Sequence, residues 1–95
     1  MRRKNNEIIE LIVLALYKLE KACCREIWNE IDDTAAGKKF ERHSLYQILR
    51  TLTKEQIVAW EASDQLIKIY SLTDKGTDYA KKIRDYYFTL LKVDK

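Results

Sequence analysis

Apolar residues recur at helical spacing along most of this 95-residue chain. The clearest case is the stretch from Phe40 to Ile57, FERHSLYQILRTLTKEQI, in which Leu45, Ile48, Leu49 and Leu52 stand at i, i+3, i+4 and i+7. This spacing predicts an amphipathic helix over 42–55. The opposite face would be basic and rich in hydrogen-bond donors, with no acid between Arg42 and Lys54.

Two helices are predicted before this stretch, over 6–21 and 23–36. The first carries two apolar stripes, one of which contains Ile9, Val13 and Leu16, so we expect it to be covered on both sides, on one of them by a partner subunit. The second has its stripe at Cys24, Ile27, Trp28 and Ile31. Glu26 follows Cys23 at the spacing of a capping box, and Gly37 is placed to end this helix.

The pattern changes after Lys54 to β-branched and aromatic residues, which predicts a hairpin over 57–72 with its turn at Ser63-Asp64-Gln65. The alternation leaves open which face of the second strand is the core. Thr73 is a suitable N-cap for a last helix over 73–93. Since no later segment could cover the apolar residues of that helix, we expect them to pack on the first helix, on a second copy of the chain, or on both.

Charge changes this picture, because the net charge of +3 is unevenly placed. Residues 36–54 contain five bases and one acid, whereas the rest of the chain holds thirteen bases and fourteen acids. The positive excess therefore belongs to the 42–55 helix and the segment leading into it, as expected of a phosphate-binding surface. Chance clustering on a small surface is the alternative.

Length and composition predict one domain over 1–95 with a modest core. No apolar run reaches the roughly 18 residues of a membrane span and no signal peptide is recognisable, so we expect an intracellular, cytoplasmic protein without a membrane partner. The adjacent Cys23 and Cys24 suit neither a mutual disulfide nor a zinc site, and no metal site is expected. We expect both thiols to be reduced; an intermolecular disulfide, in an oxidising or thermophilic setting, is the alternative.

The order helix, helix, helix, hairpin, helix is that of a winged helix-turn-helix, an α+β fold. Ser44–Leu52 (SLYQILRTL) followed by Ile57-Val58 and by Lys68–Gly76 (KIYSLTDKG) resembles the PadR group of transcriptional regulators, in which T-L-Y-x-x-L-x-x-L precedes Y-x-L-T-x-x-G. The chain is also similar to small winged-helix proteins of archaeal viruses. The resemblance covers residues 8–80 and implies a homodimeric regulator of double-stranded DNA, in a host cytoplasm if viral.

The resemblance also implies site residues. The 42–55 helix would be the recognition helix in the major groove, and the DNA-binding residues would be Lys38, Lys39, Arg42, His43, Ser44, Tyr46, Gln47, Arg50, Lys54 and, in the wing, Lys68. The dimer interface would use the first and last helices, through Ile9, Val13, Leu16, Ile83, Tyr86, Tyr87, Leu90 and Leu91. The sequence departs from the pattern twice: the usual glycine before the first wing strand is absent, and the wing tip carries Glu61 and Asp64 instead of bases.

The sequence also bears on two other functions. An enzyme is not expected, because there is one histidine, no glycine-rich phosphate loop and no carboxylate pair placed for acid–base chemistry. No cofactor and no small-molecule ligand are evident, and any effector would bind at the dimer interface. The alternative function is a winged helix used only for protein–protein binding, with the acidic wing and the aromatic last helix as its surface.

Overall fold

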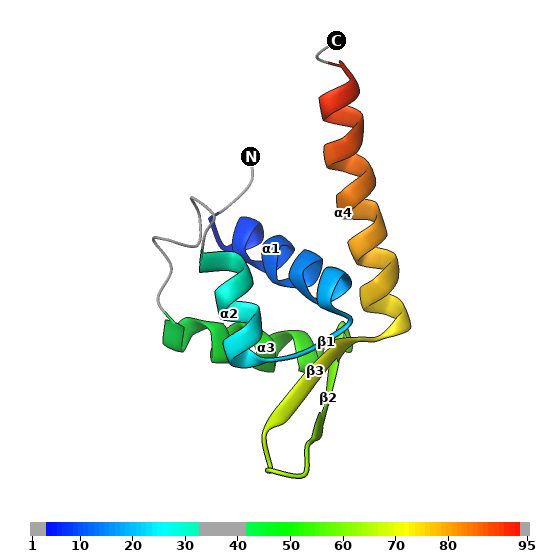
Figure 1. Cartoon of the computed structure of the whole chain (residues 1–95). Coiled ribbons are helices and arrows are strands. Elements are labelled where there is room, and N and C mark those ends of the chain that lie inside the picture. Colours follow the sequence, from blue (N-terminus) through cyan, green and yellow to red (C-terminus); the bar gives the residue numbers. More distant parts are fainter. Residues whose placement is uncertain (1–3, 33–41, 94–95) are drawn as a thin grey trace.

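A computed structural model describes residues 4–32 and 42–93, and the side chains of 8–32 and 44–86. The elements run in the order α1 (Lys4–Leu19), β1 (Lys21–Cys23), α2 (Cys24–Asp32), α3 (Arg42–Lys54), β2 (Val58–Ala62), β3 (Lys68–Leu72) and α4 (Asp74–Val93). Figure 1 shows α1 to α3 gathered above the hairpin, with α4 standing beside α1 and extending away from the other elements. Within these ranges the fold is the predicted α+β winged helix.

The core lies where α1, α2 and α3 meet the sheet. Its largest fully buried side chains come from each of these elements: Ile12, Val13, Leu16, Ile27, Ile31, Leu45, Leu49, Leu52 and Val58. Burial of aliphatic side chains of this size contributes about 1.5–3 kcal/mol each, so these residues dominate the stability of the fold.

The sheet has three strands in the order β1-β3-β2, all antiparallel, whereas two strands were predicted. β1 pairs with β3 through Lys21↔Ser71, Ala22↔Tyr70 and Cys23↔Ile69. The predicted first helix, over 6–21, is wrong at this end, because α1 stops at Leu19 and Glu20 takes a φ of 69°. Three residues are too few to show strand periodicity, and the pairing depends on β3, which lies 46 to 50 positions further along the chain.

One of the two hydrogen bonds of the expected capping box is seen at the start of α2. The backbone N–H of Cys23 donates to Glu26 Oε1 at 2.9 Å, which satisfies one of the donors left over at a helix start. The stripe predicted for this helix faces inward, with Cys24, Ile27 and Ile31 buried and Trp28 half-buried. Gly37, expected to end the helix, lies outside the described residues.

α1 is covered on both apolar sides by its own subunit. It contacts α2, α4, β1 and β3, and Val13 and Leu16 have no exposed surface at all. The expectation that these two side chains form part of a dimer interface is therefore wrong. A two-sided apolar pattern does not distinguish cover by a partner subunit from cover by the sheet and α4 of the same chain.

The structure shows which face of the second hairpin strand, β3, lies in the core. Trp60 and Tyr70 are direct partners across β2 and β3, so their side chains lie on the same face of the sheet. Tyr70 on this face is buried, whereas Trp60 is 45% exposed. The turn is closed by two backbone hydrogen bonds, Leu66 N–H to Ser63 O and Ser63 N–H to Ile67 O, both at 2.8 Å. Leu66 takes the left-handed conformation, φ 63°, that a glycine would adopt without strain.

The junction between α3 and β2 shows how the chain turns without the glycine that the PadR pattern usually has before the first wing strand. The N–H of Ile57 donates to Leu52 O at 2.9 Å and the N–H of Gln56 donates to Thr53 O at 3.1 Å. These two bonds form a Schellman motif, whose C′ position requires a left-handed residue. Gln56 occupies that position with a φ of 62°.

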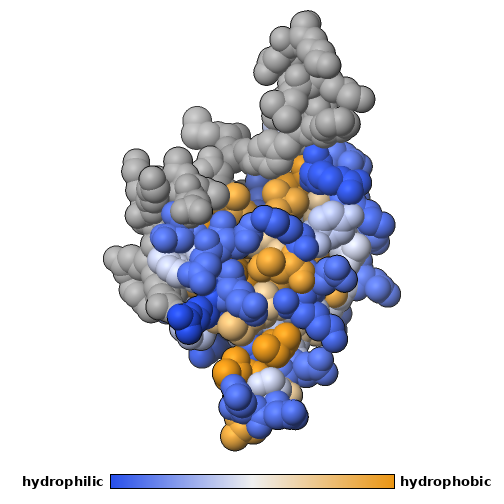
Figure 2. Space-filling view, viewed as in Figure 1, coloured by the Kyte–Doolittle hydropathy of each residue, from blue (hydrophilic) through white to orange (hydrophobic). Residues whose placement is uncertain are grey.

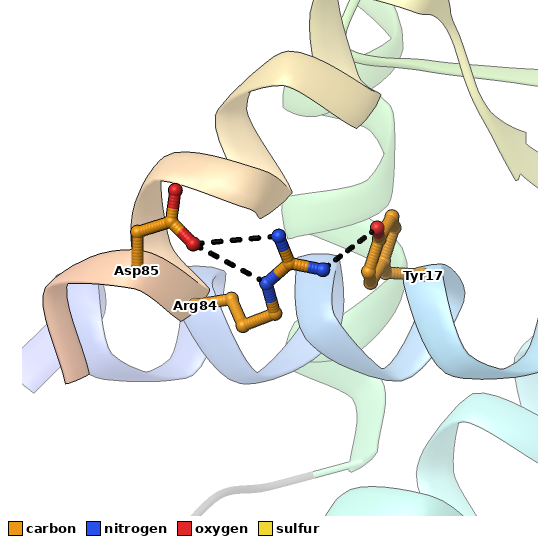
Figure 3. A network of polar contacts seen from close by, with 3 residues as sticks. All are labelled: Tyr17, Arg84 and Asp85. Atoms are coloured by element: carbon orange, nitrogen blue, oxygen red, sulfur yellow. Dashed lines mark hydrogen bonds and ion pairs between the residues drawn. The ribbon is translucent and has the colours of Figure 1, made fainter. Parts of the chain in front are cut away.

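α4 is held against α1 by a polar contact as well as by its buried Ala80 and Ile83. Figure 3 shows Arg84 lying between Asp85 on its own helix and Tyr17 on α1. Its Nη1 donates to the Tyr17 hydroxyl oxygen at 3.1 Å, and the guanidinium stands 5.7 Å from the centre of the Tyr17 ring. These contacts help to fix the direction in which α4 leaves the domain.

Candidate nucleic-acid interface

α3 has one buried face and one open face. Leu45, Leu49 and Leu52 are buried in the core and Ile48 is half-buried, which agrees with the predicted apolar stripe. On the other side the helix exposes the polar side chains Tyr46, Gln47, Arg50, Thr51 and Lys54. The open face is therefore built from donors and bases, as a surface in contact with a duplex requires.

The charge of this face is not neutralised by neighbours. α3 contains no acidic residue, and in the described part of the chain neither Arg50 nor Lys54 forms an ion pair. The hydroxyl groups of Thr51 and Thr53 instead donate to the helix backbone, at Gln47 O (3.1 Å) and Leu49 O (2.7 Å). Arg50 and Lys54 therefore give the open face a positive charge that no ion pair among the described residues offsets.

Tyr70 connects this face to the sheet. Burial raises the pKa of its hydroxyl above the ordinary value of 10.0, Cys24 and Tyr46 raise the pKa further, and Arg50 acts in the opposite direction. Tyr46 and Arg50 of α3 therefore lie close enough to β3 to interact electrostatically with it.

Several of the predicted DNA-binding residues lie at the start of α3 or before it. Arg42 and His43 begin the helix, and their side chains are outside the described set; Lys38 and Lys39 lie outside the described residues altogether. Ser44 is half-buried near the same helix end. These positions stay predictions.

The wing offers a different surface from α3. The Nζ atom of Lys68 lies 4.4 Å from the ring centre of Trp60, and Lys21 on β1 pairs with Glu61 on β2 at 3.6 Å. Lys68, the predicted wing contact, is therefore held against an indole, a role for Trp60 that the sequence did not indicate. The hairpin register brings the two together, because Lys68 and Trp60 lie on the same face of the sheet two positions apart.

The tip of the wing is apolar and acidic. Leu66 is 86% exposed and Ile67 is 46% exposed, next to the exposed Asp64. Figure 2 shows hydrophobic atoms at the lower end of the molecule, where the hairpin turns. Adjacent exposed apolar side chains of this kind offer a contact surface to another protein when they form part of a larger patch.

The predicted dimer-interface residues fall into three groups. Val13, Leu16 and Ile83 are buried inside the subunit, and Ile9 is half-buried. Tyr86 is 51% exposed and lines a hollow of about 380 Å³ with Glu10, Lys82 and Ile83, between α1 and α4. The side chains of Tyr87, Leu90 and Leu91 are outside the described set, although the helix carrying them continues to Val93.

Among the described residues there is no constellation for other chemistry. No group of three or more His, Cys, Asp or Glu side chains within this part of the chain could hold a metal ion. Neither cysteine forms a disulfide within the described residues; Cys24 is buried, so that of the two only the half-buried Cys23 offers surface to a second chain. The described helices also include none that is long and apolar enough to cross a membrane.

No known family model matches the sequence, and no curated protein is similar to it in sequence. Solved structures do match. A PadR family transcription regulator from Clostridium difficile is 16% identical with a TM-score of 0.73, over 90% of this chain and 92% of that one. The RosR-S4 structure is 25% identical with a TM-score of 0.71, over 90% and 70% of the two chains.

The F-93 protein of SSV1 is 20% identical, with a TM-score of 0.67, and the match covers 90% of this chain and 91% of that one. These similarities confirm the winged-helix fold and its likeness to the PadR group and to F-93. The predicted resemblance is thus confirmed for the arrangement of the helices and strands.

Proposed function

We propose that this chain is a transcription regulator that binds double-stranded DNA as a homodimer, with α3 in the major groove. The observation that carries the proposal is the open face of α3, which combines exposed Gln47, Arg50 and Lys54 with the absence of any acid on the helix. A major groove about 12 Å wide accepts one helix, and its base edges present the acceptors and donors that such side chains pair with. The description of the C. difficile relative as a transcription regulator is consistent with this role.

The side chains divide by the contact that their chemistry favours. Gln47 suits bidentate pairing with adenine, and Arg50 or Arg42 suits guanine; each such pair discriminates against the wrong base by about 1–3 kcal/mol. His43 and Ser44, near the start of the helix, are further candidates for base edges. The remaining candidates would bind phosphate and fix the register: Lys38, Lys39, Tyr46, Lys54 and Lys68.

DNA binding is tested by selecting duplexes from a random pool and measuring affinity for the selected site at two salt concentrations. A dimer making about 6–10 phosphate contacts should bind about 10³- to 10⁵-fold more weakly at 200 mM than at 50 mM salt. A scrambled duplex of the same length is the control, and it should bind more weakly at both. Failure to enrich any sequence, together with salt-independent retention of DNA, would contradict the proposal.

Dimerisation through α4 is supported by the sequence of its second half, DYYFTLLKV, and by the way the helix extends beyond the other elements (Figure 1). Apolar residues in such a segment are stabilised when a second helix covers them. We expect the double variant Tyr87→Lys, Leu91→Lys to sediment as a monomer in analytical ultracentrifugation. The variant Lys81→Glu, at an exposed position earlier in the same helix, is the matched control and should remain a dimer.

The wing favours a second candidate function, in which the winged helix binds another protein and not DNA. Its tip exposes Leu66 and Ile67 beside Asp64, and Lys68 at the start of β3 lies against the ring of Trp60. Under this alternative the pool selection would enrich nothing. Substitution of Leu66 and Ile67 by serine would then abolish partner capture without changing the oligomeric state.

A further inference from the structure

Hydrogen bonds from Thr73 and Lys75 join the start of α4 to the segment that follows α3. After α3 ends, three successive backbone carbonyls, those of Glu55, Gln56 and Ile57, all accept hydrogen bonds from the first residues around the start of α4. Because carbonyls at a helix C-terminus lack partners within the helix, these bonds satisfy groups that would otherwise need water.

Thr73 is the centre of the junction. Its N–H donates to Ile57 O at 3.1 Å, and its hydroxyl lies within donor distance of both Gln56 O and Ile57 O. The same hydroxyl oxygen accepts the N–H of Gly76 at 3.0 Å, which makes Thr73 the N-cap of α4, as predicted. One side chain therefore caps α4 and binds the segment that ends α3.

Lys75, the second residue of α4, adds a second connection. Its Nζ donates to Glu55 O at 3.0 Å, so a charged donor meets the carbonyl that lies closest to the end of α3. Lys75 and Thr73 also line a hollow of about 620 Å³ with Thr53 and Trp60, between the end of α3, β2 and the start of α4. Because this side of the junction is open, Lys75 can be changed without disturbing the core.

The far part of α4 is attached elsewhere. Arg84 contacts Tyr17 on α1, and beyond this contact the helix extends away from the other elements (Figures 1 and 3). α4 thus has two fixed points, one on the recognition-helix junction and one on α1. A shift of the helix at the first point would turn it about the second, and a 20-residue helix about 30 Å long would carry this change of direction to its far end.

We propose that Thr73 and Lys75 are positioning residues that set the angle between α3 and α4, and thereby the separation of the two half-sites that a dimer reads. This inference rests on the proposed function, since it requires DNA binding by a dimer joined through α4. Neither residue needs to touch DNA. In a dimer of this kind half-site spacing is a geometric consequence of where the two recognition helices are held.

The test measures affinity of the full-length protein for the selected half-site alone and for paired half-sites whose centres are moved in one-base-pair steps around one helical turn. We compare wild type with Thr73→Val, which removes the hydroxyl at constant shape, and with Lys75→Met. For both variants we expect the preference for the best spacing over its neighbours to fall by about three- to tenfold, the range expected for one or two lost hydrogen bonds. Affinity for the single half-site should stay within about twofold of the wild-type value, which corresponds to a change in binding free energy of less than about 0.5 kcal/mol.

Two variants serve as controls. Thr73→Ser keeps the hydroxyl and should restore the wild-type spacing profile, and Lys81→Met removes an exposed lysine of α4 away from the junction and should leave the profile unchanged. If Thr73→Val and Lys75→Met keep the wild-type profile, the proposal is overturned and Thr73 is a structural cap only. If Thr73→Val fails to fold, Lys75→Met alone decides. A wild-type protein that enriches no DNA would overturn the proposed function and this inference together.

Discussion

Gly76 lies so close to the carbonyl oxygen of Ile57 that a Cβ atom on it would come within 2.0 Å of that oxygen. The contact explains why a residue with no side chain stands three positions after the N-cap Thr73. A backbone oxygen cannot turn aside as a side chain does, so α4 and the start of β2 can approach this closely only at glycine.

Gly76→Ala should therefore destabilise the protein. Relief of the overlap requires α4 to move off Ile57, and we expect a loss of about 3 kcal/mol, at the upper end of values for overpacking. Urea denaturation followed by circular dichroism measures the change. Lys81→Ala on the same helix is the control, and a surface substitution of this kind should change stability by less than about 0.5 kcal/mol. Equal midpoints for the two variants would show that the junction is not rigid.

Gln56→Gly should instead stabilise the protein. Gln56 holds a φ of 62° in the Schellman motif that ends α3, and a non-glycine residue in this conformation carries a cost of about 1–2 kcal/mol. Glycine removes that cost but loses more entropy on folding, which leaves an expected net gain of about 0.5–1 kcal/mol. Thermal unfolding of this variant is compared with Glu55→Gly, at a neighbouring position without a positive φ, for which a loss is expected.

Arg50→Ala and Gln47→Ala test the open face of α3 directly. Both side chains are exposed, so their removal should leave stability nearly unchanged. Binding of the selected duplex should weaken by about 1–3 kcal/mol in each case, with relaxed discrimination at one base position. Fluorescence anisotropy with a panel of single-base variants of the site measures both effects. Lys81→Ala, at an exposed position of α4 away from α3, is the control; a comparable loss of binding in that variant would argue against a base contact at α3.

The raised pKa of Tyr70 predicts a dependence of stability on alkaline pH. Because its hydroxyl releases its proton less readily in the folded state than in the unfolded state, the stabilisation is complete below the unfolded-state pKa, near 10.0, and is lost as pH rises through the folded-state pKa. Thermal melts of wild type and Tyr70→Phe between neutral pH and pH 11 isolate this residue from other groups. The difference between the two melting temperatures should narrow or reverse above pH 10; a constant difference would show that Tyr70 does not titrate differently on folding.

The sequence by itself determined the helices and the hairpin, because each of them expresses a local period. The stripe of Leu45, Leu49 and Leu52 is buried as predicted, and the hydroxyl of Thr73 caps α4 as its position before Asp74 suggested. These features depend on residues only a few positions apart. The family pattern added the fold, because it relates the short motifs to one another along the chain.

Tertiary structure decided what depends on distant pairs. β1 exists because Ala22 meets Tyr70 across the sheet, and Lys68 stacks on Trp60 because the hairpin register aligns their strands. Val13 and Leu16, which were assigned to a partner by their two-sided pattern, are covered by elements of their own subunit. A hydrophobic pattern records that a side chain is covered, but it carries no information on which segment covers it, since that choice is made by the packing of the whole chain.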